Sequence, residues 1–225
     1  METSLFDPID IYCERIGPSF WAEPLNAISN ISFIIAAWFA WYLARGKTDS
    51  FALEVRILAV LIAMIGLGSF LFHTLAVRWS MYADITPISL YQGVFLYFYL
   101  RNICKLSHVV ITILLLLFLW MHLNVGLLPV PPLNGSIMYV PTLLFLWGIG
   151  VYHLYSKKHL AWGMLGASAL LTISLVFRSI DFNVCEHISI GTHALWHLLN
   201  GLVLYITVRT YALNRPTFAG VAGQN

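Results

Sequence analysis

Residues 55–74 read VRILAVLIAMIGLGSFLFHT, and this stretch decides the fold. Between Arg56 and His73 its residues are apolar apart from a single serine, Ser69, and two glycines. A helix needs roughly 20 mostly apolar residues to cross the hydrocarbon core of a bilayer, and this stretch has that length. The stretch therefore predicts a membrane-spanning helix that carries Ser69 and His73 near one of its ends.

The composition of the whole chain has the same character. Hydrophobic residues make up 60% of the 225 positions, and charged residues make up 10%. A soluble domain usually carries about 25% charged residues, so this composition excludes an ordinary soluble globule and indicates a polytopic membrane protein. Lysines and arginines are scattered between apolar runs, which excludes a nucleic-acid-binding surface.

Further apolar stretches predict an all-α fold, a seven-transmembrane-helix bundle. The connecting segments are too short to separate domains, so we expect a single domain over residues 1–225. It would begin with an extracytoplasmic segment, 1–25, and end with a cytoplasmic tail, 211–225. The seven predicted helices cover residues 26–44, 55–74, 81–100, 108–123, 136–155, 160–177 and 191–210.

The basic residues predict how the bundle is oriented. With seven helices, nine of the 12 lysines and arginines fall on the side of the C-terminus. The other three, Arg15, Arg78 and Arg178, fall on the side of the N-terminus. Because cytoplasmic loops are enriched in lysine and arginine, we expect the N-terminus outside the cytoplasm and the C-terminus inside.

Three of the eight histidines share a predicted depth with one serine and one aspartate. Ser69 and His73 are four residues apart, which places both on one face of a helix. His193 and His197 have the same spacing in the first turns of the last predicted helix. Asp84 lies in the first turns of the third predicted helix, which turns back beside the second. All five are expected just beneath the outer surface of the membrane.

Three imidazoles that converge in an apolar bundle suit Zn²⁺, which accepts three histidines and leaves a fourth position for water. The metal lowers the pKa of that water to about 7. A carboxylate such as Asp84 can then act as general base, and a hydroxyl such as Ser69 can donate a hydrogen bond to the oxyanion. An ionisable residue inside a membrane also points to function by default. The alternatives are that the histidines bond between helices, that Ser69 is a small packing residue, and that Asp84 caps its helix or pairs with Arg78.

The spacing of these five residues resembles that of the alkaline ceramidases. These belong to a wider group of seven-helix membrane hydrolases that includes the adiponectin and progestin receptors. The segments 12–14 and 21–30 also look like the N-terminal signature of the family, and the compact loops look more like its bacterial members. The resemblance implies a multi-pass protein of the bacterial inner membrane, with its metal site toward the extracytoplasmic side. The matching pattern is Ser69-x₃-His73-x₁₀-Asp84 followed by His193-x₃-His197.

The resemblance implies hydrolysis of the N-acyl bond of ceramide, or of a related membrane lipid, to a fatty acid and a free base. One alternative is a receptor-like protein on the same scaffold that binds lipid with little hydrolysis. Another is a haem protein with histidines as axial ligands. The implied roles are zinc binding by His73, His193 and His197, proton abstraction by Asp84 and assistance by Ser69.

The resemblance also implies a calcium site in the N-terminal segment. Glu14 and Glu23 match two acidic ligands of the family, although the spacing between them differs, and Asp10 is a further candidate. Calcium takes six to eight oxygens, and these three carboxylates supply only part of such a set. The alternative is that the glutamates are ordinary interfacial acids, or that Glu23 supports the N-terminus of the first helix.

The cysteines divide between the two sides of the predicted bundle. Cys13 and Cys185 are expected outside, whereas Cys104 is expected inside. An oxidising exterior permits a disulfide between the first two, and the family contains a comparable bridge. The alternative is three unpaired thiols.

Three further polar residues lie in or near the last two predicted helices. Arg178 and Asp181 are three residues apart and are expected to form a structural pair on one helix face. Asn200 lies three residues past His197 on nearly the same face. It would orient a metal ligand, or alternatively it would bond between helices.

Overall fold

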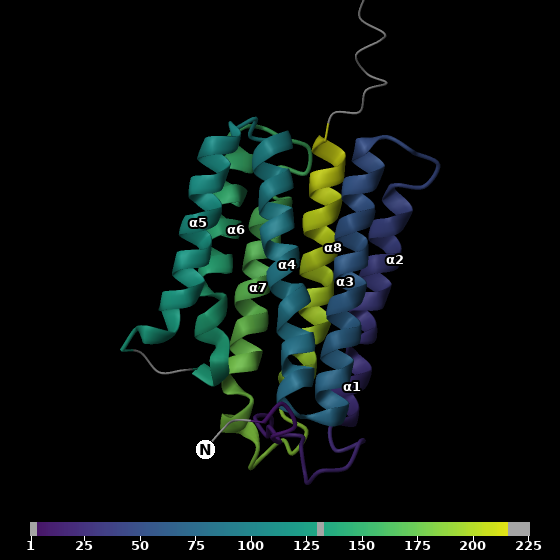
Figure 1. Ribbon diagram of the computed structural model, residues 1–225, viewed down its shortest axis with the longest axis vertical. Helices are drawn as coiled ribbons and strands as arrows, with labels where there is room; N and C mark the ends of the chain where they lie inside the picture. The colour runs from purple at the N-terminus through teal and green to yellow at the C-terminus, as the bar shows by residue number, and fades with distance from the viewer. Residues whose placement is uncertain (1–3, 130–132, 216–225) are drawn as a thin grey trace, which may run out of the picture.

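The computed structural model describes residues 4–129 and 133–215, and it is a bundle of long helices that run side by side (Figure 1). The predicted all-α fold is confirmed. In chain order the helices are α1 (Pro24–Ser29), α2 (Ile31–Leu43), α3 (Ser50–Leu75), α4 (Arg78–Asn102), α5 (His108–Asn124), α6 (Val140–Tyr155), α7 (Gly163–Ile180) and α8 (His193–Asn214), with short 3-10 helices η1 (Val125–Leu127), η2 (Leu133–Tyr139) and η3 (Phe182–Val184).

The observed helices match the predicted stretches, with shifted ends. The first predicted helix corresponds to α1 and α2 together, because Asn30 between them keeps a helical backbone. The start of α3 lies five residues before the predicted one, since the Asp49 side chain accepts a hydrogen bond from the backbone of Ala52 and caps the helix. The end of α8 reaches into the predicted tail, whose residues 216–225 lie outside the described part of the chain.

Among the described helices, five segments are long and apolar enough to cross a membrane. These are Pro24–Leu43, Ser50–Leu75, His108–Leu127, Leu133–Tyr155 and Gly163–Ile180. Helices α4 and α8 are long enough too, but both carry polar side chains that face the interior of the bundle. Many large apolar side chains point outward instead, such as Trp38 and Val109, which are 71% and 70% exposed. A surface of this kind fits contact with lipid rather than water.

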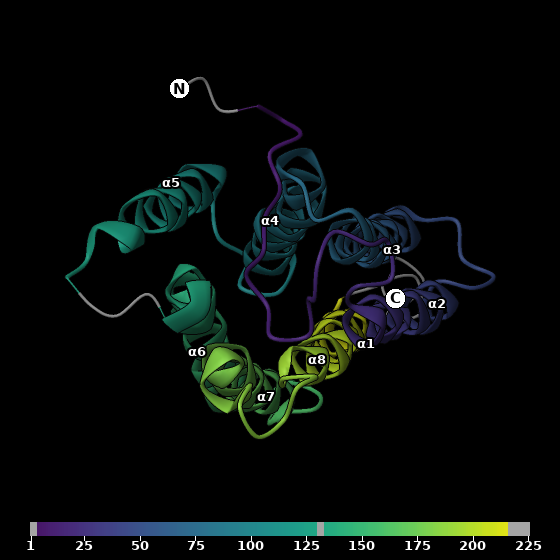
Figure 2. The same ribbon diagram turned by 90° about the horizontal axis from the view of Figure 1, so that it is seen from below.

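The helices form a ring when viewed along their axes (Figure 2). Consecutive helices from α2 to α8 pack against one another, and α2 closes the ring by packing against α8. The N-terminal segment, drawn in purple, crosses one end of the ring before α1 begins. It is held there by backbone hydrogen bonds, including those between Ile9 and Ala76 (2.8 Å) and between Arg78 and Asp7 (3.1 Å). The orientation of this end in a membrane stays a prediction.

Helices α3 and α4 approach each other closely at Gly68. A Cβ atom at this position would lie 2.1 Å from the carbonyl oxygen of Ala83, so only glycine fits without displacing a backbone. Ser69 follows Gly68, and Asp84 follows Ala83. The close contact therefore brings Ser69 and Asp84 to the same level of the bundle.

Candidate metal centre

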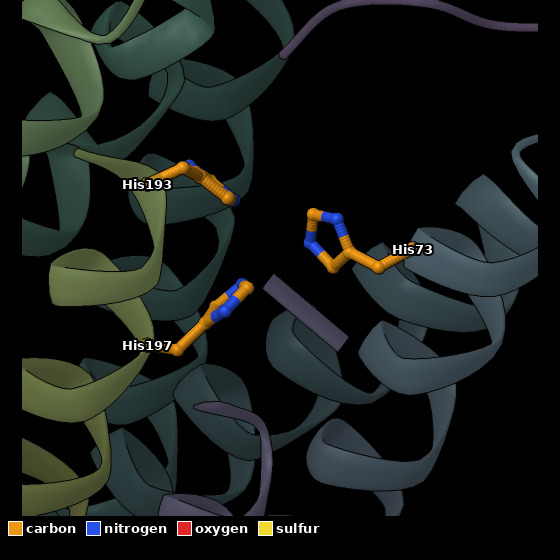
Figure 3. Close-up of side chains that lie close together, drawn as sticks. All are labelled: His73, His193 and His197. Atoms are coloured by element: carbon orange, nitrogen blue, oxygen red, sulfur yellow. The ribbon is translucent and has the colours of Figure 1, made fainter. Parts of the chain in front are cut away.

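The structure brings together the three histidines that their spacing singled out. His73, near the end of α3, faces His193 and His197 in the first turns of α8 (Figure 3). One ring nitrogen from each lies within 4.8 Å of the others, and the three residues are only 1–2% exposed. Such a group can hold one metal ion.

Two ring nitrogens in this cluster lack a partner in the described part of the chain. They are Nε2 of His73 and Nδ1 of His193, and both are buried. A buried polar atom without a hydrogen bond costs roughly 1–3 kcal/mol, so the cluster favours a ligand that satisfies such atoms. Three imidazoles in an apolar surrounding are a donor set that suits Zn²⁺, so the residues present fit this metal.

The outer nitrogens of two rings are fixed by neighbours at the two ends of α1, Glu23 just before it and Ser29 as its last residue. His73 Nδ1 lies 2.6 Å from Glu23 Oε2, and His197 Nδ1 lies 2.7 Å from Ser29 Oγ. Metal-binding histidines commonly bond their second nitrogen to a carboxylate or another polar group, which sets the ring orientation. These contacts turn Nε2 of His73 and of His197 toward the centre. Sequence reasoning placed Glu23 at a calcium site and did not single out Ser29.

A cavity of about 180 Å³ opens beside the cluster and is lined by Ser69, Asp84, His193 and His197. The rest of its wall is mostly apolar and follows α4 as far as Phe95. At a rise of 1.5 Å per residue, the distance along α4 from Asp84 to Phe95 is roughly 16 Å. The cavity therefore has one polar end at the histidines and a long apolar remainder that suits an acyl chain.

The predicted pair between Arg178 and Asp181 is wrong, because Arg178 turns toward the cavity. Its Nη1 donates to the hydroxyl of Tyr12 at 2.8 Å, and the Tyr12 ring stacks on His193 with centroids 3.7 Å apart. Burial raises the pKa of the Tyr12 phenol, which keeps it protonated. The guanidinium lies 5.5–5.6 Å from the centroids of three rings, those of Tyr12, Tyr139 and Trp196.

Asp181 instead holds the N-terminus of α8. Its Oδ1 accepts hydrogen bonds from the backbone of Thr192 (2.7 Å) and His193 (2.9 Å), and its Oδ2 accepts one from the backbone of Cys13 (2.9 Å). These bonds satisfy amides that a helix end leaves free. Gly191 has a φ of +62°, and a Cβ there would lie 2.2 Å from Asp181 Oδ1, so glycine is required beside this carboxylate.

A disulfide joins Cys13 to Cys185, with Cα atoms 5.6 Å apart, as the sequence predicted. It ties the N-terminal segment to the loop before α8, and this loop leads into His193. Cys104 is a free thiol after the end of α4.

The predicted calcium ligands are not gathered into one site among the described residues. Both carboxylate oxygens of Glu14 accept backbone hydrogen bonds, from Leu25 (2.7 Å) and Asn26 (2.8 Å). Burial raises the pKa of Glu14, although these two bonds oppose the rise. Glu23 is shared between Arg15 and His73, and Asp10 is exposed. Burial works to raise the pKa of Glu23, but its bonds to His73, Asn26 and Arg15 hold it below the usual value.

Asn200 bonds between helices, which was the alternative to orienting a metal ligand. Its amide donates to Ser174 Oγ at 2.7 Å and to the carbonyl of Trp196 at 2.9 Å, which links α8 to α7. Its side chain also lines the cavity. The contacts of Asn200 with described residues include none to a histidine of the cluster.

The fold and the site define a class: helical membrane proteins with a buried histidine cluster at the polar end of an apolar cavity. A protein-family model described as Ceramidase matches residues 12–219, which is most of the chain, and the chain belongs to this family. No curated protein matches the sequence significantly. The family acts on lipids, and membership implies an amide hydrolase of the ceramide-cleaving type.

Proposed function

We propose that this protein is a zinc-dependent hydrolase that cleaves the N-acyl bond of ceramide, or of a related N-acyl lipid, at the outer side of the membrane. The products are a fatty acid and a free amine. The observation that carries the proposal is the buried cluster of His73, His193 and His197 beside Asp84, at the polar end of an apolar cavity. Membership of the Ceramidase family supports the amide as the bond that is cut.

The zinc ligands would be Nε2 of His73, Nε2 of His197 and a ring nitrogen of His193. Glu23 and Ser29 hold the first two rings by their outer nitrogens, so these two residues orient ligands without touching the ion. When bound, zinc supplies Lewis acidity and lowers the pKa of a coordinated water to about 7.

Asp84 and Ser69 supply the remaining chemistry. A carboxylate oxygen of Asp84 takes the proton that the attacking water loses and passes it to the leaving amine nitrogen. The hydroxyl of Ser69, whose oxygen lies 3.4 Å from Nε2 of His197, donates to the negative charge that develops on the amide oxygen. Water adds across the C–N bond, so that the acyl carbon gains the hydroxyl and the nitrogen gains the proton.

The shape of the cavity supports a lipid with a long acyl chain as the substrate. An amide placed at the histidines would send its acyl chain along the apolar wall toward Phe95 and Phe118. Burying this chain removes apolar surface from contact with water or headgroups, which contributes about 25 cal/mol per Å². Binding would thereby hold the amide at the polar end.

The test combines metal analysis with hydrolysis of an N-acyl sphingoid base by purified protein. We expect about one zinc per chain in the wild type. His197→Ala should lose both zinc and activity, whereas Asp84→Asn should keep zinc and lose activity by a factor on the order of 10² or more. His108→Ala, exposed after the loop that follows α4, serves as the histidine control.

Full activity of Asp84→Asn would contradict the role of the carboxylate. Undiminished activity of thoroughly zinc-depleted protein would contradict the zinc dependence. A zinc-loaded wild type that binds the lipid without cleaving it would support the receptor-like alternative instead.

A further inference from the structure

The guanidinium of Arg15 is buried where the N-terminal segment meets the end of α3. Its Nε forms an ion pair with Glu23 Oε1, and its Nη2 donates to the carbonyl oxygen of His73 at 2.8 Å. Its Nη1 donates to the carbonyl oxygen of Gly17 at 3.3 Å. The three acceptors are one carboxylate and two carbonyl oxygens, which are the kind of hard oxygen ligands that calcium takes in proteins.

The same carboxylate that Arg15 neutralises also orients a histidine of the candidate zinc site. Glu23 uses Oε1 for Arg15 and Oε2 for Nδ1 of His73, and both side chains of the ion pair are only 3–4% exposed. A buried carboxylate without a positive partner is costly. Its position beside His73 therefore depends on the cation at Arg15.

We propose that Arg15 is a built-in cation that takes the place of a calcium ion in this segment, so that the protein does not depend on calcium. Arg15 is a positioning residue: it holds Glu23, and through Glu23 it holds the ring of His73 for metal binding. The effect on zinc rests on the proposed function, whereas the replacement of calcium does not.

The first measurement uses the wild type in calcium-depleted buffer and in buffer with millimolar calcium. We expect the same zinc affinity, measured by competition with a chromophoric zinc chelator, and the same unfolding temperature. A rise in either value with calcium would overturn the proposal. If the wild type bound no zinc, the proposed function would fail, and the unfolding temperature would still decide the calcium question.

The second measurement uses variants of Arg15. Arg15→Ala should lower zinc affinity roughly 10- to 100-fold, the usual effect of losing a group that supports a metal ligand. Millimolar calcium should restore part of this loss, because the vacated space keeps Glu23 and two carbonyl oxygens. Arg15→Lys should retain more of the zinc affinity than Arg15→Ala.

The matched control is Arg78→Ala, because Arg78 makes a partly exposed ion pair with Asp7 in the same segment. It should leave zinc affinity unchanged with or without calcium. Unchanged zinc affinity in a folded Arg15→Ala would overturn the positioning role. If Arg15→Ala failed to fold, the comparison of Arg15→Lys with the wild type, and the calcium response of the wild type, would decide.

A separate observation concerns the charge on the cavity wall. Arg178 lines the cavity, and within the described ranges no carboxylate lies within 4.0 Å of its guanidinium nitrogens. Its Nε is buried without a hydrogen-bond partner among those residues. A permanent cation inside a membrane protein is expensive and marks a functional position by default. Asp84 lines the same cavity and attracts Arg178 from beyond ion-pair distance, so a bound anion would be the direct partner of the guanidinium.

The position of Arg178 relates this anion to the scissile bond. The Tyr12 ring is stacked on His193, and its hydroxyl accepts from Arg178, so the guanidinium lies one tyrosine ring away from the histidine cluster. An amide carbonyl at the cluster would place groups a few bonds beyond its nitrogen within reach of Arg178. Three aromatic rings around the guanidinium lower the local dielectric, which strengthens its attraction for an anion.

We infer that the protein prefers lipid substrates whose amine part carries an anionic group, such as a carboxylate, sulfonate or phosphate, which Arg178 binds. The preference in hydrolysis rests on the proposed function, whereas the binding of an anion by Arg178 does not. The test of binding compares an alkyl phosphate with an alkyl alcohol of equal chain length. Wild type should bind the phosphate at least about 10-fold more tightly, a difference of 1.4 kcal/mol.

Arg178→Gln should abolish this difference in affinity. Arg101→Gln should preserve it, because Arg101 lies in the last turn of α4, at the end away from Asp84. Equal affinity of the wild type for both amphiphiles would overturn the inference. In the hydrolysis arm, N-acyl lipids with an anionic and a neutral amine part are compared at matched acyl length. Loss of the anionic preference in Arg178→Gln supports the inference, and cleavage of the neutral lipid alone contradicts it. Cleavage of neither lipid would count against the proposed function, and the binding result would still decide the anion site.

Discussion

Each imidazole of the cluster has two ring nitrogens, and the residue on the outer one decides how the inner one points. At His197 this residue is Ser29, which also donates to the carbonyl oxygen of Asn26 at 2.9 Å. The serine is thus fixed to the backbone of α1 while it contacts the ring. The rotation of His197 therefore depends on a residue 168 positions earlier in the chain.

Ser29→Ala should lower zinc affinity by roughly 10- to 100-fold, because the His197 ring loses the contact that fixes its orientation. The measurement is competition with a zinc chelator of known affinity. Ser89→Ala is the control, since Ser89 is exposed on α4 and bonds to the carbonyl of Ile85 on its own helix. Equal zinc affinity in the two variants would show that Ser29 does not orient the ring.

At this scale the sequence predicted the histidines but not their partners. A four-residue spacing shows that His193 and His197 share a helix face, and the structure confirms that they meet His73. The same logic paired Arg178 with Asp181 and was wrong, because Arg178 bonds to Tyr12 and Asp181 bonds to Cys13, both far away in the chain. Local spacing tells which residues share a face, and it does not tell which element packs against that face.

Between elements, the contact of α3 with α4 sets the position of Asp84. Gly68→Ala would force a Cβ against the carbonyl of Ala83, so one of the two helices would have to move. We expect a loss of stability of about 1–3 kcal/mol, the usual effect of overpacking, together with lower turnover. Unfolding and hydrolysis rates check this. Gly93→Ala is the control, because nothing lies within 4 Å of a Cβ there. A fully active Gly68→Ala would show that Asp84 tolerates the shift.

The N-terminus of α8 is a second element on which the centre depends. Asp181→Ala removes three backbone hydrogen bonds, two of them at the first turn of α8, so both the unfolding temperature and zinc affinity should fall. Asp49→Ala is the control, because Asp49 caps the N-terminus of α3, at the end of α3 away from His73. It should lower the free energy of unfolding by about 1 kcal/mol. The Asp49 variant should keep its zinc affinity. Equal zinc affinity in both variants would show that zinc binding does not depend on the hydrogen bonds of Asp181.

The helices themselves were predictable because apolar runs of membrane-spanning length are a strong pattern. Their ends were less so: α3 begins at a capping contact of Asp49, which hydropathy does not reveal. Helices α4 and α8 are less apolar than the others because they carry site residues such as Asp84 and His197. The two helices of full length with weaker hydropathy are thus the ones that carry polar site residues.

For the molecule as a whole, the disulfide holds the N-terminal segment across one end of the bundle. Reduction, or Cys13→Ser, should lower the unfolding temperature and weaken zinc binding, because residues 14–23 would be free to leave the end of α3. Thermal unfolding and zinc content with and without a reductant measure this. Cys104→Ser should respond to the reductant as the wild type does. Zinc binding that is insensitive to reduction would show that the other contacts of the segment suffice.

The centre draws on both extremes of the chain, with Glu23 and Ser29 near its beginning and His193 and His197 close to its end. Of the described helices α8 is synthesised last, so a nascent chain that stops short of α8 holds only one histidine of the three. Under the proposed function, such a chain lacks two of the three zinc ligands. A product truncated before α8 would then have no hydrolytic activity, and lipids would meet that activity only after α8 had packed into the bundle.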